Sequence, residues 1–266
     1  MLSRWWQNLR ARREEAAVSR RAIPDDLWKR TLVRYPFLRR KAAGDAAELR
    51  RLSSLFLDRK DFSTTGGLRL TDAMAVAIAA QAVLPVLRLG LERYDGFVGI
   101  VVHPDQVLAR REVAGDDGVM HEYDEVLSGE AMEGGPVTLS WHDVRTAGQH
   151  AQTGYNVVIH EFAHVLDMAD GQADGVPLLP STLPLTEWQC TLQAEFEHFA
   201  RRVQAAETTV LDPYGAQAIE EFFAVASESF FVNPQPMQAE HPQLYALFTR
   251  YYLQDPASDS PPLRRT

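Results

Sequence analysis

The chain has 266 residues, of which 45% are hydrophobic and 24% are charged, with a formal net charge of −9 and a single cysteine, Cys190. This composition is typical of a globular protein with a substantial core, and it excludes an intrachain disulfide and a cysteine-rich zinc site. We therefore expect a reducing, cytoplasmic compartment, and any metal ion must be held by histidine, aspartate or glutamate.

Residues 1–60 are predicted to form a basic helical segment that packs on an acidic body. They carry 16 lysines and arginines against 7 acidic residues, and their first residues lack the apolar run of a secretory signal. Helical periodicity indicates helices over Pro24–Arg34 and Gly44–Leu57. No nucleic-acid-binding motif accompanies the basic residues, so we expect no direct contact with nucleic acid.

The most apolar stretch of the chain is Ala73–Leu87, with the sequence AMAVAIAAQAVLPVL. It is interrupted by Gln81 and Pro85 and is too short to cross a membrane, so it predicts a buried helix and no membrane association. Either Thr71 or Asp72 is suited to cap its beginning.

Two strands are expected in the middle of the chain. The β-branched segments GFVGIVVHP (96–104) and PVTLSW (136–141) predict them. Between them, residues 112–135 are acidic and rich in glycine, which indicates a loop or an irregular hairpin.

The second half of the chain is predicted to be helical. A helix capped by Asn156 is expected to run to about Met168, and the Asp-, Gly- and Pro-rich residues 167–184 predict a loop. Further helices are predicted over Trp188–Arg202, Gln217–Val232 and Pro242–Leu253. Residues 61–256 then form the body, and residues 257–266 a disordered tail.

The segment VVIHEFAHVLD (157–167) contains His160 and His164, four residues apart, with Glu161 directly after the first. Residues i and i+4 of a helix lie on one face, so both imidazoles can bind one ion. Glu161 lies one step around the helix, where a general base can stand beside a metal-bound water. Random placement gives this short pattern with a chance of roughly 2 in 100, so a third ligand is needed to support it.

Three carboxylates are candidates for the third ligand. Asp170 follows the second histidine by six residues, but no glycine lies between them to make the sharp turn back. The better candidate is in the segment DPYGAQAIEEFFAVASESFF (212–231), where Glu221 and Glu228 share a helical stripe with valines and so need polar partners. Periodicity alone leaves Glu220 and Glu221 both open as the ligand, with Glu228 as an acceptor for a ligand histidine.

The segments VVIHEFAHVLDMADGQADGVP, EEFFAVASESFF, GPVTLSWHDV and HPQLYALFTRYYLQDP together resemble the Mlc titration factor A family of zinc-dependent peptidases. The resemblance runs in order from about Leu27 to Pro256. It implies an α+β, mostly helical zincin-like fold with a small mixed sheet, related in its metal centre to the anthrax lethal factor catalytic domain.

The resemblance also implies roles for particular residues. It assigns one Zn²⁺ per chain to His160, His164 and Glu221, which is a gluzincin-type site, and it makes Glu228 the second glutamate of the family pattern. Lethal-factor-like sites have a tyrosine seven residues before the glutamate ligand, and Tyr214 stands there. Aminopeptidase-like activity and binding of a transcriptional repressor, Mlc, are further expectations from the family.

The resulting hypothesis is hydrolysis of a peptide by a zinc-activated water, with Glu161 as general base and Tyr214 stabilising the oxyanion. The strand that contains Val137 and Leu139 is expected to be an edge strand along which an extended substrate binds. Asp167 either orients a ligand imidazole or caps the loop after the motif helix.

Two other functions are compatible with parts of the sequence. The first is a zinc-stabilised module that binds a repressor and has only vestigial hydrolysis. The second is a calcium site formed by Asp167, Asp170 and Asp174, although these residues lack the ligand spacing of an EF-hand.

Overall fold

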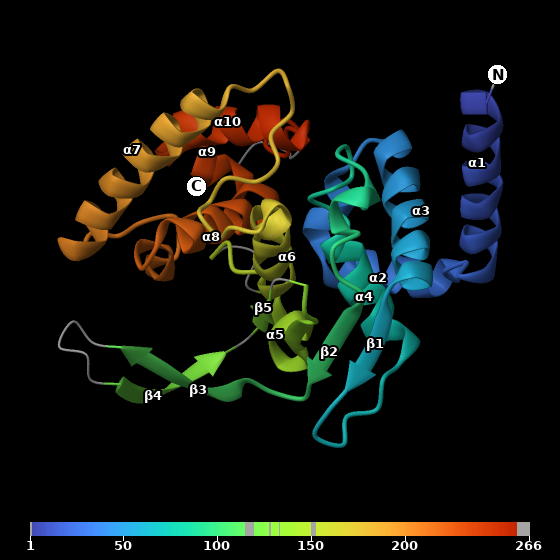
Figure 1. The fold of residues 1–266 in the computed structure, drawn as a ribbon, viewed down its shortest axis with the longest axis horizontal. Helices are drawn as coiled ribbons and strands as arrows, with labels where there is room; N and C mark the ends of the chain where they lie inside the picture. The colour runs from blue at the N-terminus through green and yellow to red at the C-terminus, as the bar shows by residue number, and fades with distance from the viewer. Residues whose placement is uncertain (1, 115–119, 128, 133, 150–152, 260–266) are drawn as a thin grey trace.

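A computed structural model describes residues 2–114, 120–127, 129–132, 134–149 and 153–259. Its main sheet has four strands in the order β1-β2-β6-β5. The strands β1 (Asp61–Thr64), β2 (Gly99–His103) and β6 (Val137–Ser140) are parallel, and β5 (Gly129–Ala131) is antiparallel to β6. The remainder is mostly helical, so the expectation of an α+β fold with a small mixed sheet is confirmed (Figure 1).

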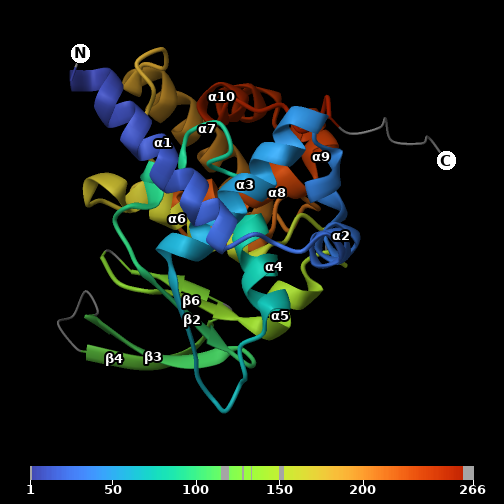
Figure 2. The same ribbon diagram turned by 90° about the vertical axis from the view of Figure 1, so that its right-hand side faces the viewer.

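The basic segment at the N-terminus packs against the rest of the chain through helices. In Figure 2, α1 (Leu2–Arg20) crosses α3 (Ala43–Arg59), and α2 (Asp25–Arg34) lies near α4 (Asp72–Ala82). Ion pairs join α1 to α3, with Arg20 Nη2 3.0 Å from Asp58 Oδ2 and Arg59 Nη2 3.3 Å from Glu14 Oε1. The division at residue 60 stays a prediction.

The Ala-rich segment forms the buried helix α4, which ends earlier than expected. Thr71 caps it, because its side chain accepts a hydrogen bond from the Met74 N–H. The helix ends at Ala82 instead of Leu87, since Pro85 cannot donate the next helical hydrogen bond. Within the described residues, no helix is both long enough and apolar enough to span a membrane.

A second small sheet is built from residues for which a loop was one expectation. The strands β3 (Val107–Ala114) and β4 (Met120–Leu127) pair antiparallel, from Val107 opposite Leu127 to Ala114 opposite Met120. The loop alternative is therefore wrong. The hairpin alternative is confirmed for the paired residues 107–114 and 120–127, with a regular register instead of an irregular one.

The C-terminal half forms a helical layer that supplies one wall of the site described below. Figure 1 shows α6 between this layer and the N-terminal helices. The layer contains α7 (Leu185–Gln204), α8 (Ile219–Val232), α9 (Pro234–Glu240) and α10 (Pro242–Tyr252), with the 3-10 turn η4 (Pro213–Ala216). Before it in the chain come α5 (Trp141–Thr146), α6 (Val157–Asp167) and the 3-10 turn η3 (Met168–Asp170), whereas the 3-10 turns η1 (Pro36–Arg40) and η2 (Leu91–Tyr94) belong to the N-terminal half.

Two details of this half differ from expectation. The helix α9 was not expected, because Asn233–Pro234 was interpreted only as the end of the preceding helix. Pro234 also occupies the first position of α9, where a proline is well tolerated. The predicted disordered tail begins at residue 257, yet Ala257 is buried and Lys41 Nζ lies 3.2 Å from Asp259 Oδ2. The packed body therefore extends to Asp259, and residues 260–266 lie outside the described part of the chain.

Candidate metal centre

The helix α6 is fixed at its start by Asn156, as the sequence predicted. The Asn156 side chain accepts a hydrogen bond from Ile159 N–H at 3.0 Å, which satisfies a free donor of the first turn. Its amide nitrogen donates to Gln81 Oε1 at 2.8 Å. Gln81 is fully buried in α4, so this polar residue in the apolar stretch anchors the cap of the motif helix.

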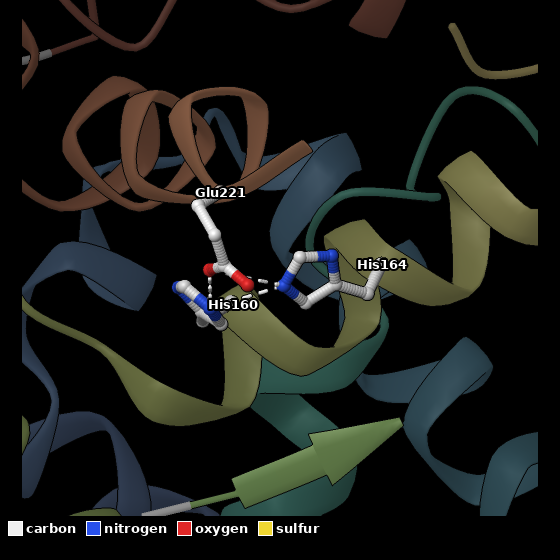
Figure 3. A group of neighbouring side chains, drawn as sticks. All are labelled: His160, His164 and Glu221. Atoms are coloured by element: carbon white, nitrogen blue, oxygen red, sulfur yellow. Dashed lines mark hydrogen bonds and ion pairs between the residues drawn. The ribbon is translucent and has the colours of Figure 1, made fainter. Parts of the chain in front are cut away.

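The two motif histidines point their rings at one carboxylate. Figure 3 shows His160 and His164 on α6 facing Glu221, which comes from α8. His160 Nε2 lies 3.1 Å from His164 Nε2 and 3.1 Å from Glu221 Oε2. His164 Nε2 lies 3.5 Å from the same carboxylate oxygen. These residues form the one possible metal cluster found within the described part of the chain.

The spacing of these three atoms fits a tetrahedral zinc ion. Ligands that bind tetrahedral zinc at 2.0–2.1 Å lie about 3.3–3.4 Å from one another. The three observed separations, from 3.1 to 3.5 Å, match that geometry within a few tenths of an ångström. Two imidazoles and one carboxylate are also a donor set that zinc prefers.

The contact between Glu228 and His160 increases the need for a positive charge in the cluster. Its Oε1 lies 2.8 Å from His160 Nδ1, and its other oxygen accepts from the Asn156 backbone N–H. If Nδ1 carries the proton and donates to Glu228, Nε2 of a neutral His160 has a lone pair facing the Glu221 carboxylate. Two acceptors at 3.1 Å repel each other unless a cation or a proton lies between them.

The pKa values around the cluster show the same need for positive charge. Burial alone would lower the pKa of His160, but its hydrogen bonds to Glu221 and Glu228 raise that pKa well above the ordinary value. Burial alone would raise the pKa of Glu221, whereas hydrogen bonds from both histidines bring it well below the ordinary value. Both shifts favour a positive charge between His160 and Glu221, which is the place that a metal ion fits.

Glu161 lies on the adjacent face of α6 and is buried, with 4% of its surface exposed. Burial raises the pKa of its carboxyl group to about 8, and the nearby Glu221 and Glu228 add to that effect. The side chain packs against Gly129 of β5. Glu161 is not part of the cluster of three possible ligand atoms.

Tyr214 is brought to the metal centre by the turn η4. Its ring centroid lies 6.0 Å from that of His160, and the residue is 38% exposed. The Asp212 side chain accepts from the Tyr214 N–H at 2.9 Å, and Gly215 packs closely on Phe222 and Val225 of α8. The same helix therefore positions both Glu221 and the turn that presents Tyr214.

Among the alternatives for a third ligand, the geometry favours Glu221. Neither Glu220 nor Asp170 belongs to the cluster. The exposed Asp170 accepts instead from the Gln172 N–H at 3.1 Å, which closes a local turn. Asp174 does the same with the Val176 N–H. A calcium site on Asp167, Asp170 and Asp174 is therefore not formed, since no such group of carboxylates is found in the described residues.

Asp167 caps the loop that follows α6. Its Oδ2 accepts from the Gly175 N–H at 3.0 Å, and its Oδ1 has no hydrogen-bond partner within the described residues. It therefore makes no hydrogen bond to His164, and of the two roles expected for it, the loop-capping one is observed. Burial raises the pKa of Asp167 to about 7.

The expectation that the strand with Val137 and Leu139 forms a sheet edge is wrong. The strand β6 pairs with β2 on one side and with β5 on the other, and both side chains are buried. The outer strand next to the candidate metal centre is β5, which local pattern did not predict because it is three residues long and falls within the expected loop. Within the described sheet, β6 therefore has no edge to which an extended ligand could add, and β5 is the outer strand.

Comparison of the sequence with known proteins places the chain in a family. The sequence model described as glucose-regulated metallo-peptidase M90 matches residues 6–253. The chain belongs to this family. An uncharacterized protein of Synechocystis sp. is 35% identical over 244 residues, which are 91% of this chain and 88% of that protein. Proteins named Mlc titration factor A are similar too. That of Serratia proteamaculans is 37% identical, over 75% of this chain and 76% of its own, and that of Pectobacterium atrosepticum is 33% identical, over 84% of each.

Proposed function

We propose that the protein is a zinc-dependent peptidase, with one Zn²⁺ held by His160, His164 and Glu221. The observation that carries the proposal is the set of three ligand atoms with separations of 3.1, 3.1 and 3.5 Å. Membership in a metallopeptidase family supports it. A bound zinc ion supplies a Lewis acid that polarises a carbonyl and lowers the pKa of a water molecule.

The protein's own residues supply the proton transfers. Glu161 is proposed to accept a proton from the attacking water and to return it to the leaving amine. A carboxyl group with a pKa near 8 holds the transferred proton readily at neutral pH, and the positive charge of a metal ion would favour its ionised form before the reaction. The phenol of Tyr214 is proposed to donate a hydrogen bond to the oxyanion of the tetrahedral intermediate.

The substrate is proposed to be an extended peptide that adds to the outer edge of β5. That strand ends the sheet beside α6, and its residue Gly129 contacts the general base. Backbone hydrogen bonds to an edge strand fix a peptide without reading its sequence, which suits a peptidase. We propose aminopeptidase-like cleavage of short peptides as the specificity, in a cytoplasmic protein.

Three variants test the metal assignment and the base separately. Glu161→Gln should retain zinc, measured by metal analysis of the purified protein, and should lose most of the rate on fluorogenic aminoacyl and short peptide substrates. Glu221→Ala should lose zinc and rate together. Glu220→Ala is the matched control, since this neighbouring carboxylate is outside the cluster, and it should keep both. A Glu221→Ala protein that binds zinc and cleaves like the parent would contradict the ligand assignment.

Binding of a transcriptional repressor is a second candidate function, because several relatives are named Mlc titration factor A. The two functions separate in one experiment. Glu161→Gln protein is added to an Mlc-type repressor bound to labelled operator DNA, and release of the DNA is followed by mobility shift. Release by the inactive variant supports binding as the function, and release that requires the active enzyme supports proteolysis.

A further inference from the structure

The edge strand β5 approaches the proposed general base so closely that it has no room for a side chain at one position. A Cβ atom placed on Gly129 would lie 2.4 Å from Oε1 of Glu161, 2.6 Å from its Cγ and 2.7 Å from its Cδ. Carbon atoms in contact are normally about 3.5–4.0 Å apart. The Glu161 side chain therefore occupies the volume that any residue other than glycine would need.

Backbone conformation does not explain this glycine. Its φ angle lies outside the left-handed range that requires glycine, in contrast to Gly134 with a φ of +63° on the same segment. Gly129 is instead held in regular antiparallel pairing opposite Leu139 of β6. Close approach is the remaining reason for a residue without a side chain here.

Neither the Glu161 side chain nor the strand β5 can move away easily to make room for a Cβ at position 129. The Cγ atom of Glu161 is one bond from the Cβ on the helix, so relieving the contact requires a new side-chain rotamer and not a small swing of the carboxylate. Glu161 is buried, and β5 is bound to β6, whose other side is bound to β2. A Cβ at position 129 would therefore displace the carboxylate by about 1 Å.

We propose that Gly129 is a positioning residue for Glu161. Because Gly129 has no side chain, the Glu161 carboxylate can pack directly against the strand that binds the substrate, and this contact fixes the position of the general base. This inference rests on the proposed function. It means that β5 would position both the backbone of the substrate and the carboxylate of the base. The distance between the two would then be fixed by this one strand.

The kinetic test is the single substitution Gly129→Ala in the full, zinc-loaded chain. A displacement of about 1 Å at a catalytic group costs about 100-fold in rate, so kcat should fall by about that factor while the zinc content stays unchanged. The matched control is Gly44→Ala, which makes the same chemical change in α3, where a Cβ meets nothing within 4 Å, and which should keep the parent rate. A Gly129→Ala enzyme with the parent kcat would overturn the proposal.

A double-mutant cycle distinguishes positioning of Glu161 from a general structural role. In the Glu161→Gln background no base remains to be displaced, so adding Gly129→Ala should change the residual rate by no more than about two-fold. If Gly129→Ala costs the same factor in both backgrounds, the residue acts through something other than Glu161, and the proposal is wrong.

Thermal unfolding tests the contact without any assay of activity. Gly129→Ala should lower the Tm by at least about 2 °C in the parent, because it overpacks a filled space. It should leave the Tm unchanged in a Glu161→Ala background, where the obstructing atoms are gone. If the single variant does not fold, the Gly129→Ala/Glu161→Ala protein should fold, and its failure would overturn the proposal.

The two proposals fail in different ways. If the parent has no peptidase rate that depends on Glu161, the proposed function fails. If Glu161→Gln abolishes the rate and Gly129→Ala does not lower it, the proposed function stands and the role of Gly129 is refuted.

Discussion

Two histidine–carboxylate clusters in this protein differ in how their charge is balanced. In the candidate metal centre, His160 contacts Glu221 and Glu228, and no lysine or arginine pairs with either carboxylate within the described residues. In the second cluster, the fully buried His241 contacts Glu195 at 2.8 Å and lies 3.4 Å from Glu240.

The second cluster contains its own cation. Arg202 Nη1 lies 3.0 Å from Glu240 Oε1, and that carboxylate also accepts from the Val210 N–H. A buried group of like charges is costly unless an opposite charge compensates it. The comparison teaches that a histidine beside two glutamates is a structural pair when the protein supplies the cation, and a candidate metal site when it does not.

The largest expected effect concerns the aromatic neighbour of each histidine. Tyr214 lies beside His160, whereas His241 has Phe199, with ring centroids 6.3 Å apart. Tyr214→Phe makes the first environment resemble the second, and it should lower kcat by about 10²–10³, since it removes one oxyanion donor. Zinc content and Tm should remain those of the parent. A variant with unchanged kcat would show that the phenol has no role in the reaction.

The next largest effect is on metal affinity. Glu228→Gln should weaken zinc binding by about 10–100-fold, because it removes the acceptor that orients the His160 ring. Competition with a zinc indicator dye measures the change. The equivalent substitution in the second cluster, Glu195→Gln, should leave zinc affinity unaltered, and equal losses in the two variants would mean that Glu228 acts through general stability.

Removal of the metal should lower the stability of the folded protein only when the first cluster is intact. At free zinc of about 100 times Kd, binding stabilises the folded state by about 2.7 kcal/mol, which corresponds to a Tm higher by roughly 5–10 °C. A chelator should remove this increment from the parent and from Arg202→Ala, and should have no effect on Glu221→Ala. A Tm of the parent that does not respond to chelation would contradict the metal site.

The smallest expected effect is a release of protons. Because the pKa of His160 in the metal-free protein is well above its ordinary value, that ring is protonated at neutral pH and must lose its proton to bind zinc. Metal affinity should therefore fall as the pH falls. Titration calorimetry in buffers of different ionisation enthalpy should detect at least about one proton released per zinc bound at pH 7. No proton release would refute the protonated metal-free state.

Much of the fold and most of the site could be predicted from local pattern. Thr71 and Asn156 cap their helices as expected, since capping depends on a side chain and the first turn of its own helix. His160, Glu161 and His164 could be grouped because four residues make one turn of helix. Local pattern was insufficient where two short elements meet, as at Pro234, which ends one helix and begins another.

The sequence by itself determined which groups could carry the chemistry: two imidazoles on one helical face, a glutamate next to them, and a distant helix with three candidate carboxylates. The family resemblance favoured Glu221 over Glu220, which periodicity had left open, and the tertiary structure places Glu221 against the histidines. Only the tertiary structure decided that β5 and not β6 is the outer strand of the described sheet, and that Gly129 leaves room for Glu161. The physical reason is that these choices depend on the rotation of α8 about its axis and on the order of strands in the sheet. Both are set by packing between segments that are far apart in the chain.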